Sequence, residues 1–123
     1  GTGLAGVVFR DQCQYLEGND ISRLMVEKCR TREGVYDKVT HNNLMNHLRR
    51  QRDESFDLIL SADVVMYLHD DDLAAMIASV RRVLEPGGMF VFSTEAHDGS
   101  ENFVRLESER FAHSRKYVLG LVE

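Results

Sequence analysis

Residues 55–92 read SFDLILSADVVMYLHDDDLAAMIASVRRVLEPGGMFVF, and this stretch decides the fold. Its first part, residues 55–63, carries a near-continuous apolar run, which predicts a strand covered on both faces. Residues 71–88 place apolar side chains at helical spacing, with aspartates before them, arginines near their end and a final Pro-Gly-Gly that predicts the stop. Residues 89–96 predict a second buried strand. A strand, a helix and a strand in this order predict a parallel sheet.

The rest of the chain continues the alternation. The predicted elements are a helix at 4–13, a strand at 14–20, a helix at 21–34, a strand at 36–43, a helix at 44–54, a loop at 97–113 with an extended piece at 103–108, and a helix from Ser114 onward. Strict alternation predicts an α/β fold with a doubly wound, mainly parallel sheet and helices on both faces.

The composition and charge of the chain argue against several classes of protein. A chain of 123 residues suits a single domain, and its net charge of −5 gives no basic excess for a nucleic-acid backbone. No apolar run reaches the ~20 residues that span a bilayer. Cys13 and Cys29 form no CxxC pair, which favours free thiols and a cytoplasmic location. The histidines are scattered, so we expect no metal site, and neither nucleic acid nor membrane is an expected partner.

Three strand ends carry residues suited to a ligand, because open α/β sheets bind ligands at the carboxyl ends of their strands. The chain begins with the turn Gly1-Thr2-Gly3, where glycine lets the backbone approach a ligand closely. Asp20 ends the next strand and could bind ribose hydroxyls or cap the following helix. Ser61-Ala62-Asp63 follows the clearest strand and could contact a ligand or close a turn.

These motifs together resemble a known family. GTGLAG, GNDIS, SFDLILSADVVMYLHD and VLEPGGMFVFSTE resemble successive motifs of the class I S-adenosylmethionine-dependent methyltransferases, in order and spacing, from residue 1 to about residue 95. Residues 95–118 resemble a small subgroup associated with tetratricopeptide repeats. The resemblance implies a Rossmann-like methyltransferase fold that lacks the family's first strand and last two strands. Residues 1–123 would then form one partial methyltransferase domain.

The resemblance also implies which residues bind S-adenosylmethionine: Gly1, Thr2, Gly3, Asp20, Ile21, Asn43, Leu44, Ser61, Ala62 and Asp63. In the family the glycine turn lies under the methionine and ribose, the acid at Asp20 binds the ribose, and the apolar residue at Ile21 lies beside the adenine. The pair at Asn43 often has an acid that contacts the adenine amine, and an amide oxygen can still accept that hydrogen bond.

Methyl transfer needs mainly alignment of the acceptor and exclusion of water, and some enzymes add a base. The candidate bases are Asp63, His69, Glu95, His97 and His113. We take Asp63 and His97 as the catalytic candidates. The alternatives are a helix cap for His69 and ordinary loop or packing positions for His97 and His113.

Several alternatives stay open at this point. The acceptor is expected to be a small molecule, but its identity is not readable from these residues. A methyltransferase-like interaction module without turnover is the rival reading. Glycines at 1, 3 and 6 also fit the G-x-G-x-x-G spacing of nicotinamide dinucleotide sites. A missing central strand would leave two unpaired edges, which predicts a homo-oligomer, strand exchange or further residues at that place, unless the neighbouring strands close up.

Overall fold

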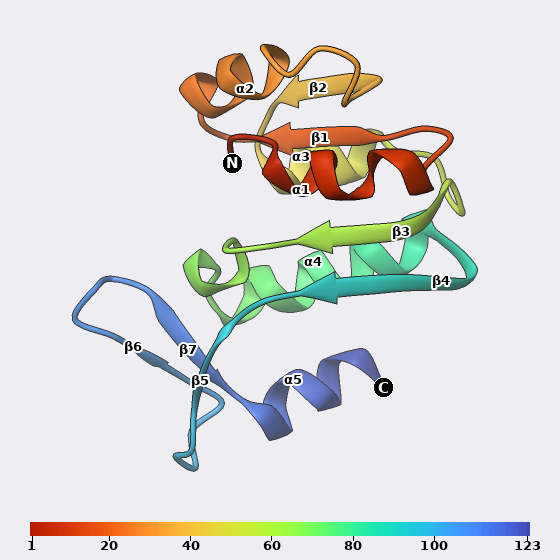
Figure 1. Ribbon diagram of the computed structural model, residues 1–123. Coiled ribbons are helices and arrows are strands. Elements are labelled where there is room, and N and C mark those ends of the chain that lie inside the picture. Colours follow the sequence, from red (N-terminus) through yellow and green to blue (C-terminus); the bar gives the residue numbers. More distant parts are fainter. The chain divides into compact units, whose positions relative to one another are not determined.

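The computed structural model describes residues 1–123 and consists of two compact units, Gly1–Arg50 and Gln51–Glu123 (Figure 1). Each unit contains a pair of parallel strands with helices between and after them. This arrangement confirms the predicted α/β class with parallel strand pairing. None of the helices combines the length and the apolar character that crossing a bilayer requires.

The first unit contains one parallel strand pair and three α-helices. Its elements are α1 (Leu4–Phe9), the 3-10 helix η1 (Arg10–Gln12), β1 (Glu17–Asp20), α2 (Arg23–Arg30), β2 (Lys38–His41) and α3 (Leu44–Arg50). β1 pairs with β2 from Glu17 opposite Lys38 to Asp20 opposite His41. Asp20 and His41 therefore stand side by side at the carboxyl end of this pair.

Ser22 and Asp20 both accept hydrogen bonds at the start of α2. The Ser22 hydroxyl accepts a hydrogen bond from the Met25 N–H at 3.4 Å, so Ser22 is the cap. The Asp20 carboxylate accepts a hydrogen bond from the Ser22 N–H at 2.7 Å, one step outside the helix. Both side chains thus fix the start of α2, and Val26 and Cys29 form its buried face.

The second unit contains a longer parallel pair, one long helix and a small additional sheet. Its elements are β3 (Phe56–Ser61), the 3-10 helix η2 (Val65–Tyr67), α4 (Asp70–Val83), β4 (Leu84–Phe92), β5 (Glu95–His97), β6 (Phe103–Arg105), β7 (Phe111–Ser114) and α5 (Arg115–Val122). α4 supplies most of the core through its predicted apolar stripe, Leu73, Met76, Ile77, Val80 and Val83, all of which are buried.

The predicted end of α4 at Pro86-Gly87-Gly88 is wrong. The helix ends at Val83, and Leu84 is already extended and pairs with Phe56 at the start of β4. The proline and glycines therefore lie inside an irregular strand, where the pairing shifts between Phe56 and Leu58. Proline cannot donate to a strand ladder, so it is tolerated only at such an irregularity.

Within the second unit, β3 is covered on one face only, and not on both as predicted. Leu58 and Leu60 are 39% exposed, and their partners Met89 and Val91 on β4 are 61% and 43% exposed. Phe90 points to the other face, where it borders a cavity that Ile77 and Val80 of α4 also line. One face of the β3–β4 pair thus packs on α4 and the other is open.

Residues 97–113 are more ordered than the predicted loop. β5 pairs in parallel with β7, and β6 pairs antiparallel with β7, which makes a three-stranded sheet. β5 and β6 have three residues each, too few for an alternating pattern to be visible. The predicted helix start is confirmed, because the Ser114 hydroxyl accepts a hydrogen bond from the Tyr117 N–H at 3.3 Å.

Candidate functional site

The glycine turn leads directly into α1. Gly3 precedes the helix with φ at +85°, a left-handed conformation that favours glycine. A Cβ built on Gly3 would lie 2.7 Å from the Cys29 Sγ, so no larger residue fits there. The turn is therefore tightly packed at Gly3.

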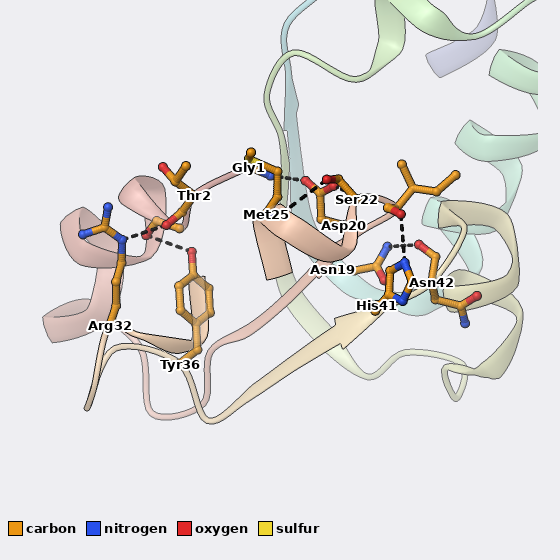
Figure 2. A network of polar contacts seen from close by, with 12 residues as sticks. Gly1, Thr2, Asn19, Asp20, Ser22, Met25, Arg32, Tyr36, His41 and Asn42 are labelled. Atoms are coloured by element: carbon orange, nitrogen blue, oxygen red, sulfur yellow. Dashed lines mark hydrogen bonds and ion pairs between the residues drawn. The ribbon is translucent and has the colours of Figure 1, made fainter. Parts of the chain in front are cut away.

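Asp20 lies next to this turn at the end of β1 (Figure 2). One carboxylate oxygen accepts from the Ser22 N–H, and the other pairs with the Gly1 nitrogen. Burial raises the pKa of Asp20, whereas the hydrogen bond from the Ser22 N–H lowers it. The usual pKa of an aspartate lies about three units below 7, so Asp20 is ionised at neutral pH, and its oxygens keep lone pairs for a ligand.

The residues beside Asp20 expose an apolar side chain to solvent. Ile21 is 68% exposed, and its carbonyl is hydrogen-bonded to the His41 Nε2 at 3.0 Å. The Asn19 amide donates to the Asn42 carbonyl at 3.3 Å across the same strand ends (Figure 2). These contacts tie the ends of β1 and β2 together and hold Ile21 outward next to the Asp20 carboxylate.

Asn43 and Leu44 lie where α3 begins. The Asn43 Oδ1 accepts from the Met45 N–H at 2.9 Å and from the Asn46 N–H at 3.4 Å, which is a helix-capping arrangement. Leu44 is the first residue of the helix and is half-buried. The amide oxygen that the family resemblance assigns to the adenine is therefore already engaged within this chain.

The second unit holds the remaining predicted ligand contacts at the end of β3. Ser61 is buried, and its carbonyl accepts from the Ser93 N–H at 3.1 Å. The Ser93 hydroxyl in turn accepts from the Asp63 N–H at 2.9 Å. Asp63 has φ at +57°, which is uncommon for a residue with a side chain. Glu54 and Glu109 share this left-handed conformation, so it does not by itself mark Asp63 as functional.

The histidines of this unit differ in environment. At the end of β5, the His97 Nδ1 accepts from the Gly99 N–H at 3.1 Å, while its Nε2 is buried without a partner. His69 lies edge-on against the rings of Phe103 and Phe111, which is a packing role. The side chain of Glu95, another candidate base, forms an ion pair with Arg110 at 2.8 Å.

His113 is 1% exposed, and its Nδ1 lies 2.9 Å from the Thr94 hydroxyl. Burial lowers the pKa of His113, although the Leu68 carbonyl and the Asp70 carboxylate act in the opposite direction. The ring is therefore neutral in the folded protein at neutral pH. It is a buried structural histidine, as the alternative reading of the sequence allowed.

This burial predicts a pH-dependent stability. The folded pKa of His113 lies below its unfolded value of about 6.5, so its contribution is fully present above that pH and is lost as the pH falls toward the folded pKa. We expect the melting temperature to fall between pH 7.5 and 5.5, and to fall less steeply in His113→Gln. Thermal denaturation of both proteins across this range checks the expectation, and parallel curves would contradict it.

The structure also identifies three residues that the sequence did not single out. The Tyr36 hydroxyl and the Arg32 guanidinium both contact carbonyls of the glycine turn from the segment between α2 and β2. Ser93 connects Ser61 with Asp63 in the second unit. Their partners are distant in sequence, so a local pattern could not reveal them. The absence of side chains at Gly3, Gly6 and Gly18 leaves the space that the Tyr36 ring occupies.

A comparison with known protein families identifies one that this chain matches. A family model described as a methyltransferase domain matches residues 1–92. A search of curated proteins gives no match.

Solved structures share the fold. A methyltransferase from Mesorhizobium loti described as S-adenosylmethionine-dependent matches with a TM-score of 0.78 and 20% identity, over 99% of this chain and 68% of that one. The 1,6-didemethyltoxoflavin-N1-methyltransferase of Burkholderia thailandensis, solved with S-adenosylhomocysteine, matches with a TM-score of 0.78 and 18% identity, over 99% and 54%. The cyclase SpnF matches with a TM-score of 0.79 and 15% identity, over 99% and 46%. This chain therefore spans about half to two thirds of these proteins. At such identities the likeness concerns the fold, which also serves a cyclase.

Proposed function

The chain belongs to the methyltransferase domain family, and on that premise we propose that it transfers a methyl group from S-adenosylmethionine to a small-molecule acceptor. The observation that carries the proposal is the Asp20 carboxylate, which the Ser22 N–H orients at the end of β1 beside the Gly1–Gly3 turn. Both features lie within the part of the chain that the family model matches.

The residues present fit this cofactor. Asp20 can accept hydrogen bonds from the ribose hydroxyls, because each carboxylate oxygen has a second lone pair beyond its present contact. The exposed Ile21 side chain offers an apolar surface for the adenine. The backbone of Gly1, Thr2 and Gly3 lies beside Asp20 and can approach a ligand closely, because the glycines carry no side chain. Asn43 and Leu44 would bound the adenine side through α3.

Chemistry is assigned to the second unit. The cofactor supplies an activated methyl group, so the protein has chiefly to align the acceptor and exclude water. The family resemblance assigns Ser61, Ala62 and Asp63 to the methyl-transfer step, and Asp63 is an exposed carboxylate suited to take a proton from the acceptor. A hydroxyl or carbonyl oxygen of the acceptor would satisfy the unpartnered Nε2 of His97.

A turnover screen of the full-length protein tests this function. We expect S-adenosylhomocysteine to accumulate when S-adenosylmethionine is supplied with pools of small-molecule acceptors, and to stay at background without them. Binding of the cofactor with no turnover on any pool would favour the rival reading, a non-catalytic methyltransferase-like module. Binding of a nicotinamide dinucleotide in place of S-adenosylmethionine would favour the hypothesis that Gly1, Gly3 and Gly6 form a dinucleotide-binding turn.

We also propose that the chain exchanges a strand with a second copy of itself. β1 pairs only with β2, and β3 pairs only with β4, so each of these strands keeps one edge with unpaired backbone groups. A strand exchanged with a second copy would satisfy such an edge. Light scattering on the full-length protein should then give a dimer, whereas a monomer at all concentrations would exclude exchange between copies.

The cytoplasm is the compartment we assign to the reaction. Both cysteines are free thiols in the structure, and Cys29 is buried. Free thiols persist in a reducing compartment, which supports this assignment.

A further inference from the structure

Tyr36 joins the end of the glycine turn to α1 through one hydroxyl group. Its oxygen accepts a hydrogen bond from the Gly6 N–H at 3.0 Å and donates one to the Gly3 carbonyl at 3.2 Å. Burial raises the pKa of Tyr36, so the hydroxyl keeps the proton that it donates. The side chain comes from residue 36, thirty or more positions away in the sequence, and points at the turn (Figure 2).

The ring of Tyr36 also determines how closely the glycine turn approaches β1. A Cβ on Gly6 would overlap the ring, a Cβ on Gly3 would lie 3.1 Å from it, and a Cβ on Gly18 would lie 3.0 Å from it. The ring is therefore wedged among the backbones of the turn, α1 and β1. Gly18 lies in β1, the strand that ends at Asp20, so the ring fills the space between the turn and the strand that carries the carboxylate.

Arg32 adds a second contact of the same kind. Its Nε donates a hydrogen bond to the Thr2 carbonyl at 2.7 Å (Figure 2). In a trans peptide the N–H points opposite to the carbonyl, so drawing the Thr2 and Gly3 carbonyls toward Arg32 and Tyr36 turns the N–H groups of Gly3 and Leu4 away from them. The first N–H groups of a helix have no partner within it, so these two donors stay available to a ligand.

We propose that Tyr36, supported by Arg32, is the positioning residue of the cofactor site: it orients the donors of the glycine turn and fixes their distance from Asp20. This inference rests on the proposed function, because it assigns the site to S-adenosylmethionine. Tyr36 acts through the turn and does not itself touch the cofactor.

Tyr36→Phe tests the inference, because it keeps the ring and removes only the hydroxyl. We expect the affinity of the full-length protein for S-adenosylhomocysteine to fall about tenfold, since two neutral hydrogen bonds that hold the turn are lost. The binding stoichiometry should stay unchanged, and in turnover the KM for the cofactor should rise while the KM for the acceptor does not. A merely destabilised protein would lose stoichiometry without a change in Kd.

Matched controls separate the possible outcomes. Tyr15→Phe removes another hydroxyl of the same unit, which bonds to Glu17 at 2.9 Å, and should leave the Kd unchanged. Arg32→Lys should weaken binding, whereas Arg30→Lys, which alters a bond to the Val39 carbonyl at 2.9 Å, should not. If the wild type binds and Tyr36→Phe binds equally well, the positioning role is overturned. If the wild type fails to bind, the proposed function itself has failed.

Discussion

Replacing Asp20 with alanine is expected to weaken the binding of S-adenosylhomocysteine by about 100-fold, because two hydrogen bonds to a charged acceptor are lost. The carboxylate is held in place by the Ser22 N–H, so it is oriented before a ligand arrives. A calorimetric titration of the full-length wild type and variant measures the difference.

Two variants control for indirect effects. Asp20→Asn keeps an oxygen for the Ser22 N–H but removes the charge, and we expect it to lose part of the affinity. Glu27→Gln removes another carboxylate of the same unit, one that pairs with Arg23 at 3.0 Å along α2, and should leave the Kd unchanged. An unaltered Kd in Asp20→Ala would rule out Asp20 as the ribose ligand.

Replacing Gly6 with alanine is expected to lower the free energy of unfolding by about 2 kcal/mol, as is typical when a methyl group is forced into packed space. Gly6 is buried within α1, and its Cβ would overlap the Tyr36 ring, which is fixed by two hydrogen bonds. Helix propensity alone predicts the opposite sign, because alanine favours a helix over glycine by about 1 kcal/mol. Chemical denaturation measures the sign and size of the change.

Gly120→Ala is the matched control. Gly120 also lies in a helix, α5, but nothing lies within 4 Å of its Cβ, so alanine should stabilise there by about 0.5–1 kcal/mol. Combining Gly6→Ala with Tyr36→Leu should cost less than the sum of the single changes, because the smaller side chain relieves the overlap. Additive costs, or a stabilising Gly6→Ala, would show that the ring does not press on Gly6.

The sequence predicts the elements of the fold well where a periodic pattern is long. α4 and its buried face follow from apolar spacing over fourteen residues. Its end could not be placed, because Leu84 continues the apolar spacing and only its pairing with Phe56 makes it extended. The open face of β3 was missed for a related reason: an apolar run shows that both faces are apolar, but not that both are covered.

For the candidate site, the sequence predicts single ligand-facing residues better than it predicts the side chains that hold them in place. The place of Asp20 after a strand and of glycines before a helix was readable from spacing alone. The capping by Asn43 was not predicted, because the family resemblance assigned its amide oxygen to the adenine, although asparagine before a helical segment is a common cap. Tyr36 was not predicted either, because its contacts with Gly3 and Gly6 form only when β2 pairs with β1 and brings the preceding loop beneath the turn.

A calorimetric titration of the full-length protein with S-adenosylmethionine tests the central claim most directly. The glycine turn, the ionised Asp20 and the exposed Ile21 together predict saturable, equimolar binding of this cofactor, with no competition from a nicotinamide dinucleotide. A folded protein that takes up no S-adenosylmethionine, or that binds the dinucleotide instead, would contradict the account.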